Sequence, residues 1–286
     1  NVAVLFLLKY VNFGINTING IAGFSGRMGN LLKGTSWLVP LGISYYSLSL
    51  MGYVVDVYYG IAQPLKSPAR LALYGMFFPC MLSGPILRFR EDGNQFFVPH
   101  SFDYVQVTRG MQRMLWGFFK VLVISERMAL VVNTVYGDYI SYPGIYIWIG
   151  TIAFAFQLYT NFSGGMDIAL GIAQSFGLKL PENFDRPFFS KTISEYWRRW
   201  HITLGAWFKD YIFYPISLGT HFQKFSQNCR KHMNRYYAAT IPGIFALFAV
   251  WFGNGIWHGA EWKYIIYGLY YYVIMVLGML LEPAFV

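Results

Sequence analysis

Two long apolar runs near the end of the sequence, Ile241–Trp257 and Tyr264–Leu281, constrain the fold most strongly. About 20 mainly apolar residues are enough for a helix to cross the hydrocarbon core of a bilayer. Charged residues make up 12% of the chain, whereas a soluble domain carries about 25%. Because an unpaired strand edge is not tolerated in lipid, we predict an all-α, polytopic membrane protein. Further apolar runs lie near residues 2–11, 37–59, 71–87, 114–135 and 145–177.

The charge distribution predicts an orientation in the membrane. Residues 179–235 hold ten Lys and Arg against four Asp and Glu, whereas residues 128–178 hold no Lys or Arg. Because cytoplasmic loops are enriched in Lys and Arg, we predict that 179–235 is cytoplasmic and that loop 136–144 lies outside. Alternating crossings then bring His258 toward the outer half of the membrane. The tryptophans and apolar flanks of the basic stretch argue against nucleic acid as its partner.

The chain is interpreted as one membrane domain, residues 1–286, because no repeat or soluble linker interrupts it. It begins with Asn1 rather than Met and ends in an apolar context at Glu282–Val286, so we expect it to be an internal piece of a longer protein. Cys80 and Cys229 lie far apart in sequence. They predict free apolar thiols rather than a disulfide or a thiolate metal site.

Three segments carry local predictions. Pro181–Pro187 is bracketed by prolines and is expected to be a loop. Thr192–Tyr214 is expected to form one helix on or in the membrane, because large apolar side chains recur along one face at three- and four-residue steps. Asn161–Asp167, which is rich in small and polar residues, is expected to be a broken or re-entrant helix.

Two histidines, His258 and His201, lie in apolar, aromatic surroundings. An ionisable group is costly in a bilayer, so one placed there indicates a functional site. An imidazole can accept a proton near neutral pH because its ordinary pKa is about 6.5. Gly253, Gly255 and Gly259 leave room beside His258 for a backbone or a substrate, and Gly205 leaves room beside His201. The alternative is a buried histidine bonded to a carbonyl.

The remaining polar residues suggest less. His100, His221 and His232 lie in polar loops and are expected to be solvated. Asp56 and Asp167 lie within apolar runs and are interpreted as structural groups bonded to neighbouring helices. No paired-histidine or cysteine-cluster motif is present, so no metal site is expected. Likewise, no glycine-flanked serine or lysine-bearing phosphate loop is present.

Longer motifs resemble those of a known family. They are Pro181–Phe188, Glu195–Leu204, which includes Trp197-Arg198-Arg199-Trp200-His201, and Trp207–Phe213, together with Trp257-His258-Gly259. Further matches are Leu41–Tyr46, Ser83–Ile86 and Gln112–Lys120. Together they are similar to the membrane-bound O-acyltransferase (MBOAT) family over roughly residues 37–272. The resemblance is greatest to its bacterial branch of alginate O-acetyltransferases and D-alanyl-lipoteichoic acid transferases. The loop Ser217–Tyr237 lacks the Gly- and Asn-rich turn of many alginate-type members, which weakens an assignment to alginate itself.

The resemblance implies a fold and a set of site residues. The fold would be a ring of transmembrane and re-entrant helices around a central channel. His258 would be the main catalytic residue and would accept the proton of the attacking hydroxyl. His201 would be its companion and would bind or orient the incoming thioester or polarise its carbonyl. The count of membrane crossings places it toward the opposite face of the membrane from His258. Residues expected to bind substrate are Trp200, Arg199, Asp210, Asn254 and Trp257.

The predicted function is transfer of an acyl group, preferably acetyl, from a cytoplasmic thioester to a hydroxyl of a cell-envelope polysaccharide. The donor would be acetyl-coenzyme A or an acyl-carrier thioester, and no bound cofactor is expected. A bacterial plasma-membrane location and an extracellular esterase-like partner follow by analogy. D-alanyl transfer to teichoic acid is the first alternative, because Glu261–Tyr270 resembles that branch while Arg198–His201 resembles the acetyl branch. A transporter and a structural scaffold are further alternatives.

Overall fold

The computed structural model describes residues 2–24, 32–37 and 40–282. Within these ranges the regular elements are helices, and Phe184 and Trp200 form an isolated β-bridge. The all-α prediction is therefore confirmed. Of the apolar end at Glu282–Val286, residues 283–286 lie outside the described residues. The first part of the chain forms α1 (Val2–Phe24), α2 (Ile43–Tyr58), α3 (Pro68–Gly75), α4 (Phe78–Met81), α5 (Phe89–Asp92) and the 3-10 turn η1 (Asn94–Phe97).

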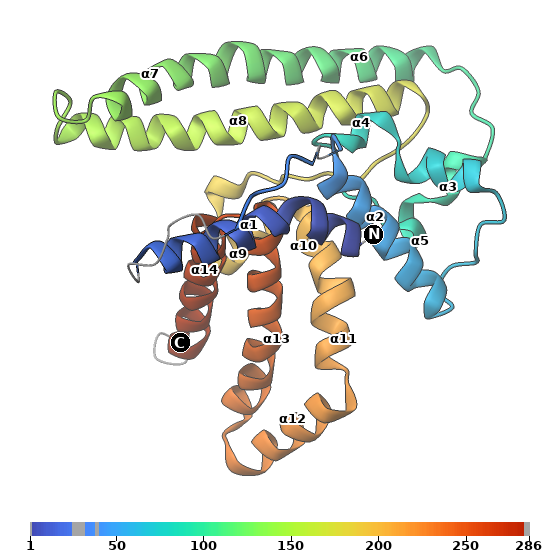
Figure 1. Cartoon of the computed structure of the whole chain (residues 1–286). Helices are drawn as coiled ribbons and strands as arrows, with labels where there is room; N and C mark the ends of the chain where they lie inside the picture. Colours follow the sequence, from blue (N-terminus) through green and yellow to red (C-terminus); the bar gives the residue numbers. More distant parts are fainter. Residues whose placement is uncertain (1, 25–31, 38–39, 283–286) are drawn as a thin grey trace.

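A long helical hairpin forms one layer of the molecule (Figure 1). Its first arm runs through α6 (Tyr104–Phe118), the π-helical segment η2 (Phe119–Ser125) and α7 (Glu126–Gly137), and its second arm is α8 (Ile145–Ser175). The arms approach closely where a Cβ on Gly117 would lie 2.6 Å from the Gly164 carbonyl oxygen. This absence of side chains at the contact permits backbone-to-backbone packing of the kind common between membrane helices.

Asp167 joins the two arms electrostatically. Its carboxylate accepts a hydrogen bond from Arg113 Nε at 3.0 Å and also pairs with Lys120 Nζ. The predicted structural role of Asp167 is confirmed. The predicted break at Asn161–Asp167 is wrong, because α8 continues through this segment without interruption. The small residues there serve close packing against α6 and η2 rather than a turn.

The C-terminal part of the chain forms a body that extends away from the hairpin layer (Figure 1). It contains α10, η4, α11 and α12, which lead to the paired helices α13 and α14. Helix α13 begins after Asn234, whose side chain accepts a hydrogen bond from the Tyr237 N–H at 2.9 Å. The bounds are η3 (Pro187–Phe189), α9 (Ile193–Arg199), α10 (Ile202–Phe208), η4 (Lys209–Phe213), α11 (Tyr214–Ser217), α12 (Thr220–His232), α13 (Arg235–His258) and α14 (Trp262–Leu281).

Within the described residues, α13 and α14 are long and apolar enough to cross a membrane. The predicted runs 239–257 and 263–281 are thus confirmed as helices of spanning length. The run 71–87 does not form one helix, because it divides between α3 and the short α4. Pro79 lies at the start of α4, where its missing N–H is tolerated.

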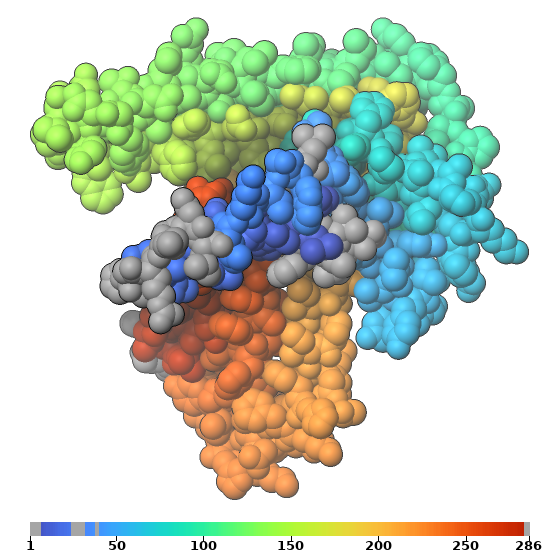
Figure 2. Space-filling model, in the orientation of Figure 1, coloured from blue at the N-terminus to red at the C-terminus, as the bar shows by residue number. Residues whose placement is uncertain are grey.

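The surface of the hairpin layer is strongly apolar. Figure 2 shows this layer as a slab over the body. Large exposed side chains on it include Leu115, Trp116, Leu122, Leu130, Trp148, Ile152 and Phe154. Water-soluble proteins rarely expose apolar surface on this scale, so lipid is the solvent that suits it.

Three smaller predictions concern the cysteines, the other histidines and the loop Ser217–Tyr237. Cys80 and Cys229 are both free and buried, as expected. His100, His221 and His232 are exposed, which confirms their solvation. The expected loop Ser217–Tyr237 instead contains the helix α12. Phe222, Phe225 and Cys229 recur along α12 at three- and four-residue steps, a short apolar stripe that is typical of a surface helix.

Candidate functional site

The site begins with a short hook between two segments of the chain. The Asp185 N–H donates to the Arg199 carbonyl, and the Ile202 N–H donates to the Asn183 carbonyl, both at 3.0 Å. Phe184 and Trp200 form the antiparallel bridge between these bonds. The loop predicted at Pro181–Pro187 is confirmed, and it pairs with the residues that connect α9 to α10.

This pairing interrupts the helix predicted over Thr192–Tyr214. Helix α9 ends at Arg199 and α10 begins at Ile202, so that prediction is wrong. His201 between them adopts a left-handed backbone conformation with φ 48°. Such a conformation is unfavourable for a residue with a Cβ, and it persists where surrounding contacts hold it. The hydrogen bonds of the hook supply those contacts, and side-chain periodicity contains no signal of them.

Asn183 determines how the His201 ring is protonated. Its Oδ1 accepts hydrogen bonds from the Thr203 N–H and from the Thr203 hydroxyl, each at 3.0 Å, and lies 3.2 Å from His201 Nδ1. A backbone N–H can only donate, so the atom facing it is the amide oxygen. His201 Nδ1 must therefore carry the proton, and Nε2 of the neutral ring presents a lone pair. Sequence reasoning missed Asn183, because its partners lie 18 and 20 residues further along the chain.

The His201 ring is buried among aromatic side chains. Its centroid lies 4.8 Å from the Phe162 ring of α8 and 5.8 Å from the Trp257 ring of α13. The side chain is 5% exposed, and Nε2 has no hydrogen-bond partner among the described residues. The lone pair of Nε2 is therefore available to a ligand. A neutral ring with this tautomer cannot donate from Nε2 to a carbonyl oxygen, which argues against the predicted carbonyl-polarising role.

His258 is the last residue of α13 and is exposed. Its ring lies 5.0 Å from Trp257, 5.7 Å from Tyr267 and 6.4 Å from Tyr264, measured between centroids. No hydrogen bond of its side chain to a carbonyl is present in the described part of the chain. The alternative of a buried, carbonyl-bonded histidine therefore does not describe His258.

The two imidazoles contact the same indole, that of Trp257. A helix of the length of α13 extends about 36 Å at roughly 1.5 Å per residue, whereas the hydrocarbon core is about 30 Å thick. Two rings that contact one side chain at the end of such a helix cannot lie at opposite faces. The predicted separation of His201 and His258 across the membrane is wrong, and their predicted proximity is confirmed.

The predicted separation of the two histidines is wrong because of the path that the basic stretch, residues 179–235, follows through the structure. From His201 the chain runs through α10, η4 and α11 beside α13 to α12 at the far end of that helix (Figure 1). The charge count placed all of residues 179–235 on one side of the membrane. In the structure these residues instead extend along α13 from one end to the other (Figure 1). The number of charges in a segment gives no information on the direction in which that segment runs through the structure.

The predicted substrate-binding residues fall into different settings. Trp200 is buried and stacks on Tyr196, with centroids 5.6 Å apart. Arg199 pairs with Glu195 at 2.7 Å. The pKa of Glu195 is lowered by the Lys191 backbone N–H and then by Arg199, so this partner stays ionised. Asp210 on η4 pairs with Arg88 and Arg90 and so joins η4 to α5.

The last two predicted residues, Asn254 and Trp257, lie on α13 beside the histidines. Asn254 is 7% exposed, and its Oδ1 has no hydrogen-bond partner in the described ranges. The Trp257 indole N–H donates to the Ser44 carbonyl of α2 at 3.0 Å. This hydrogen bond fixes the indole N–H of Trp257 to α2, while the Trp257 ring contacts both imidazoles. Asp56, also on α2, accepts a hydrogen bond from the Tyr211 hydroxyl at 2.9 Å, which confirms its structural role.

Gly255 supports the position of His258. A Cβ on Gly255 would lie 2.6 Å from the Tyr264 carbonyl oxygen, and one on Gly268 would lie 2.4 Å from the Trp251 carbonyl oxygen. The backbones of α13 and α14 are therefore in close contact just before the site. The predicted close approach of another backbone is confirmed at Gly255, whereas Cβ atoms on Gly253 and Gly259 would meet the side chains of Phe208 and Tyr264.

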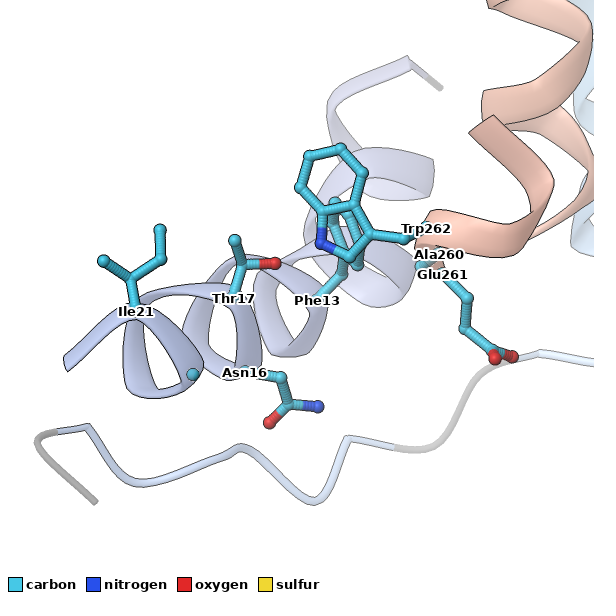
Figure 3. Close-up of a pocket in the computed structure, with 8 residues that line it drawn as sticks. Phe13, Asn16, Thr17, Ile21, Ala260, Glu261 and Trp262 are labelled. Atoms are coloured by element: carbon cyan, nitrogen blue, oxygen red, sulfur yellow. The ribbon is translucent and has the colours of Figure 1, made fainter. Parts of the chain in front are cut away.

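Two pockets lie near these residues. One of about 360 Å³ is lined by Arg186, Phe189 and Arg199. A second, of about 620 Å³, lies between α1 and the turn that follows His258 (Figure 3). Neither is lined by His201 or His258. Residues lining the second pocket are Phe13, Asn16, Thr17, Gly20, Ile21, Ala260, Glu261 and Trp262.

Comparison with known proteins identifies the family. The model of the membrane-bound O-acyltransferase family matches residues 35–228, which include the hook and His201. The chain belongs to the membrane-bound O-acyltransferase family. The resemblance predicted from the motifs is thereby confirmed. The match ends before α13, so it does not extend to His258.

Curated relatives match a larger share of the chain than the family model does. The probable alginate O-acetylase AlgI of Pseudomonas putida is 34% identical over 272 residues, which is 95% of this chain and 52% of that protein. The peptidoglycan O-acetyltransferase of Helicobacter pylori is 29% identical, over 94% of this chain and 52% of that protein. The teichoic acid D-alanyltransferase of Bacillus subtilis is 30% identical, over 82% of this chain and 58% of that protein. The chain spans about half the length of the curated relatives it matches.

Proposed function

We propose that the protein is a membrane O-acyltransferase that moves an acyl group from a cytoplasmic thioester to a hydroxyl of a cell-envelope polysaccharide. Family membership and the activities for which the relatives are named support this proposal. The observation that carries it is the contact of both His201 and His258 with the ring of Trp257. Two imidazoles at one aromatic surface can serve one acyl group, whereas two at opposite faces cannot.

In the proposed reaction His258 accepts the proton of the attacking hydroxyl. The hydroxyl oxygen bonds to the acyl carbon, the carbon–sulfur bond breaks, and the thiolate leaves and takes up a proton. General-base assistance of this kind contributes roughly 10²- to 10⁴-fold in rate. The exposure of His258 suits this role, because an acceptor from outside the protein can reach it.

The substitution His258→Ala should reduce acyl transfer by at least about 10²-fold, because it removes the proton acceptor. Transfer is measured as polymer-bound acyl groups in membranes that contain the complete protein. The control is His232→Ala, which changes an exposed histidine on α12 and should leave transfer unchanged. Activity of the His258→Ala protein equal to that of the wild type would contradict the role of His258.

Acetyl is the proposed acyl group, and D-alanyl is the second candidate. The alginate O-acetylase relative supports acetyl, and the 30% identity to a teichoic acid D-alanyltransferase favours the alternative. NMR analysis of wall polymers from a deletion strain would distinguish them, through loss of acetyl esters or loss of D-alanyl esters. A gene for a carrier protein and a D-alanine ligase beside this one would favour D-alanyl.

The setting of the reaction is part of the proposal. We infer a multi-pass protein of the bacterial plasma membrane, in which this chain is one membrane domain of a longer protein. The remainder of that protein would complete a ring of helices around a channel that leads to the two histidines. An extracellular esterase-like protein would receive or deliver the acyl group outside.

A further inference from the structure

A cluster of positive charge lies at the end of α13 that is remote from His258. Lys224, Arg230 and Lys231 lie on α12, and Arg235 is the first residue of α13. Residues 211–260 contain these four basic residues and no Asp or Glu. All four side chains are exposed. We name these four residues the basic patch.

The protein itself does not neutralise the basic patch. Each ion pair that the structure describes joins other residues. No hydrogen bond of these four side chains is present in the described part of the chain. A carboxylate at this end of the molecule, that of Glu282, contacts the Tyr236 hydroxyl instead. Because uncompensated like charges repel one another, an anion that binds here stabilises the arrangement.

Two tyrosines place the patch at the end of both spanning helices. The Tyr236 hydroxyl donates to the Met279 carbonyl at 2.6 Å, and the Tyr237 hydroxyl donates to the Leu280 carbonyl at 3.3 Å. Helix α13 therefore begins at the level where α14 ends. Tyrosines are enriched where a membrane helix meets the lipid headgroups. Arg235, the residue before them, thus lies at headgroup level.

Helix α12 turns its apolar side to α13 and leaves its basic side open. The Phe225 ring contacts the Phe245 ring of α13 with centroids 5.4 Å apart, and Cys229 is buried. Lys224 and Lys231 lie about 140° and 200° around the helix from Cys229, at roughly 100° per residue. An amphipathic helix with basic residues opposite its apolar side, at the boundary of a membrane, is typical of binding to the headgroup region.

The distribution of the charges favours lipid headgroups over an acidic protein. The four residues are spread over α12 and the first turn of α13, around a helix end rather than on one flat face. Protein interfaces are centred on buried aromatic or apolar anchors, whereas the apolar side of α12 is occupied by α13. Lipid headgroups surround a membrane helix at this level and need no apolar anchor on the protein.

We propose that the basic patch binds the phosphate groups of anionic phospholipids at the membrane surface. Arginine pairs with phosphate through two parallel N–H bonds, and lysine does so as a point charge. Clusters of basic residues beside a membrane helix are attracted to the anionic cytoplasmic leaflet, so we place the patch in that leaflet. The bound lipids hold α12, and with it the beginning of α13, at the membrane surface. This inference does not depend on the proposed acyl transfer.

Lipid binding to the complete protein tests the proposal. The probes are dioleoylphosphatidylglycerol, which is anionic, and dioleoylphosphatidylcholine, which has the same acyl chains and no net charge. Native mass spectrometry of the delipidated protein in a neutral detergent measures how much of each lipid binds. We expect the wild type to bind phosphatidylglycerol at least about fivefold more tightly, since a single basic residue near an anionic surface contributes about fivefold in affinity. This preference should fall as the salt concentration rises.

Substitution of two lysines tests the residues. Lys224→Gln together with Lys231→Gln should weaken phosphatidylglycerol binding by at least about fivefold and leave phosphatidylcholine binding unchanged. Both positions are exposed on α12, so the fold should be unaffected. The matched control changes Lys66 and Lys179, two exposed lysines on other segments, to Gln and should keep the preference of the wild type. Adding Arg230→Gln and Arg235→Gln to the first pair should abolish the preference.

Equal affinity of the wild type for the two lipids would overturn the proposal, as would equal losses in the double variant and in its control. An acidic acyl carrier protein is the other partner that four positive charges could attract. Its binding to the wild type and to the Lys224→Gln/Lys231→Gln protein is measured in the same way. If the substitutions weaken binding of the carrier protein and leave phosphatidylglycerol binding unchanged, the patch docks a protein and the lipid proposal is wrong.

Discussion

At the scale of single residues, the chemistry of the site depends on hydrogen bonds that are remote in sequence. His201 is available as an acceptor because Asn183 occupies its other nitrogen. Asn183 can do so because its amide oxygen is oriented by the Thr203 N–H. The residue type of His201 was evident from the sequence, but its tautomer follows from this chain of contacts.

The same reasoning predicts different effects for two buried tryptophans. The Trp207 N–H donates to the Leu48 carbonyl at 2.8 Å, whereas the Trp197 N–H has no partner in the described ranges. Trp207→Phe removes this buried hydrogen bond and should lower the free energy of unfolding by about 0.5–1.5 kcal/mol. Trp197→Phe removes an unpaired donor and should cost clearly less.

Thermal unfolding of both variants in detergent, without donor present, checks this prediction. The two substitutions remove similar ring volumes, so each serves as the control for the other. If Trp197→Phe destabilises the protein as much as Trp207→Phe, the Trp197 N–H has a partner within the protein itself.

At the scale of elements, the pair α13–α14 carries His258 and sets its position. The apolar runs predicted both helices because a continuous apolar segment of this length has few other stable conformations in a membrane. Their close contact depends on Gly255 and Gly268, which leave the two backbones free to approach. His258 lies one turn beyond Gly255, so the spacing of the helices determines where its ring lies.

Gly268→Ala should disturb this pair. The new Cβ would lie 2.4 Å from the Trp251 carbonyl oxygen and 3.2 Å from the Gly255 Cα, so the backbones must separate. Overpacking of this kind typically costs about 1–3 kcal/mol, and the displacement of His258 should also lower acyl transfer. Unfolding and transfer are measured on the same preparation.

Gly243→Ala is the matched control for that substitution. Gly243 also lies on α13, but no atom lies within 4 Å of a Cβ placed there. Because alanine is a better helix former than glycine, stability should be equal or slightly higher. Comparable losses from the two variants would show that helix packing is not the cause.

At the scale of the whole molecule, the hook joins parts that are separate in sequence. Asn183 contacts Met166 of α8 through its amide nitrogen, at 3.1 Å from Sδ, and holds the start of α10 through Thr203. Ile86, which lies between α4 and α5, donates its N–H to the Thr203 hydroxyl at 3.0 Å. The hairpin layer, the N-terminal region and the site segment therefore meet at one buried network.

Asn183→Ala should weaken this junction. It removes the acceptor of the Thr203 N–H, the Thr203 hydroxyl and His201, all buried. We expect a loss of about 3 kcal/mol or more in the free energy of unfolding, because each donor left unpaired costs about 1–3 kcal/mol. Chemical unfolding measures it, with Asn228→Ala at an exposed position of α12 as the neutral comparison. A loss below about 1 kcal/mol would mean that water replaces the amide oxygen.

The amino-acid sequence by itself determined the membrane class, the family and the identity of the two histidines. These follow from composition, from apolar length and from local motifs, all of which act over short distances along the chain. It did not reveal the break at Trp200–His201, the continuity of α8 through Asn161–Asp167 or the role of Asn183. Those depend on backbone pairing and side-chain contacts between remote segments. The meeting of His201 and His258 at Trp257 was decided only by the tertiary structure, because the direction in which a chain turns back is set by packing rather than by periodicity.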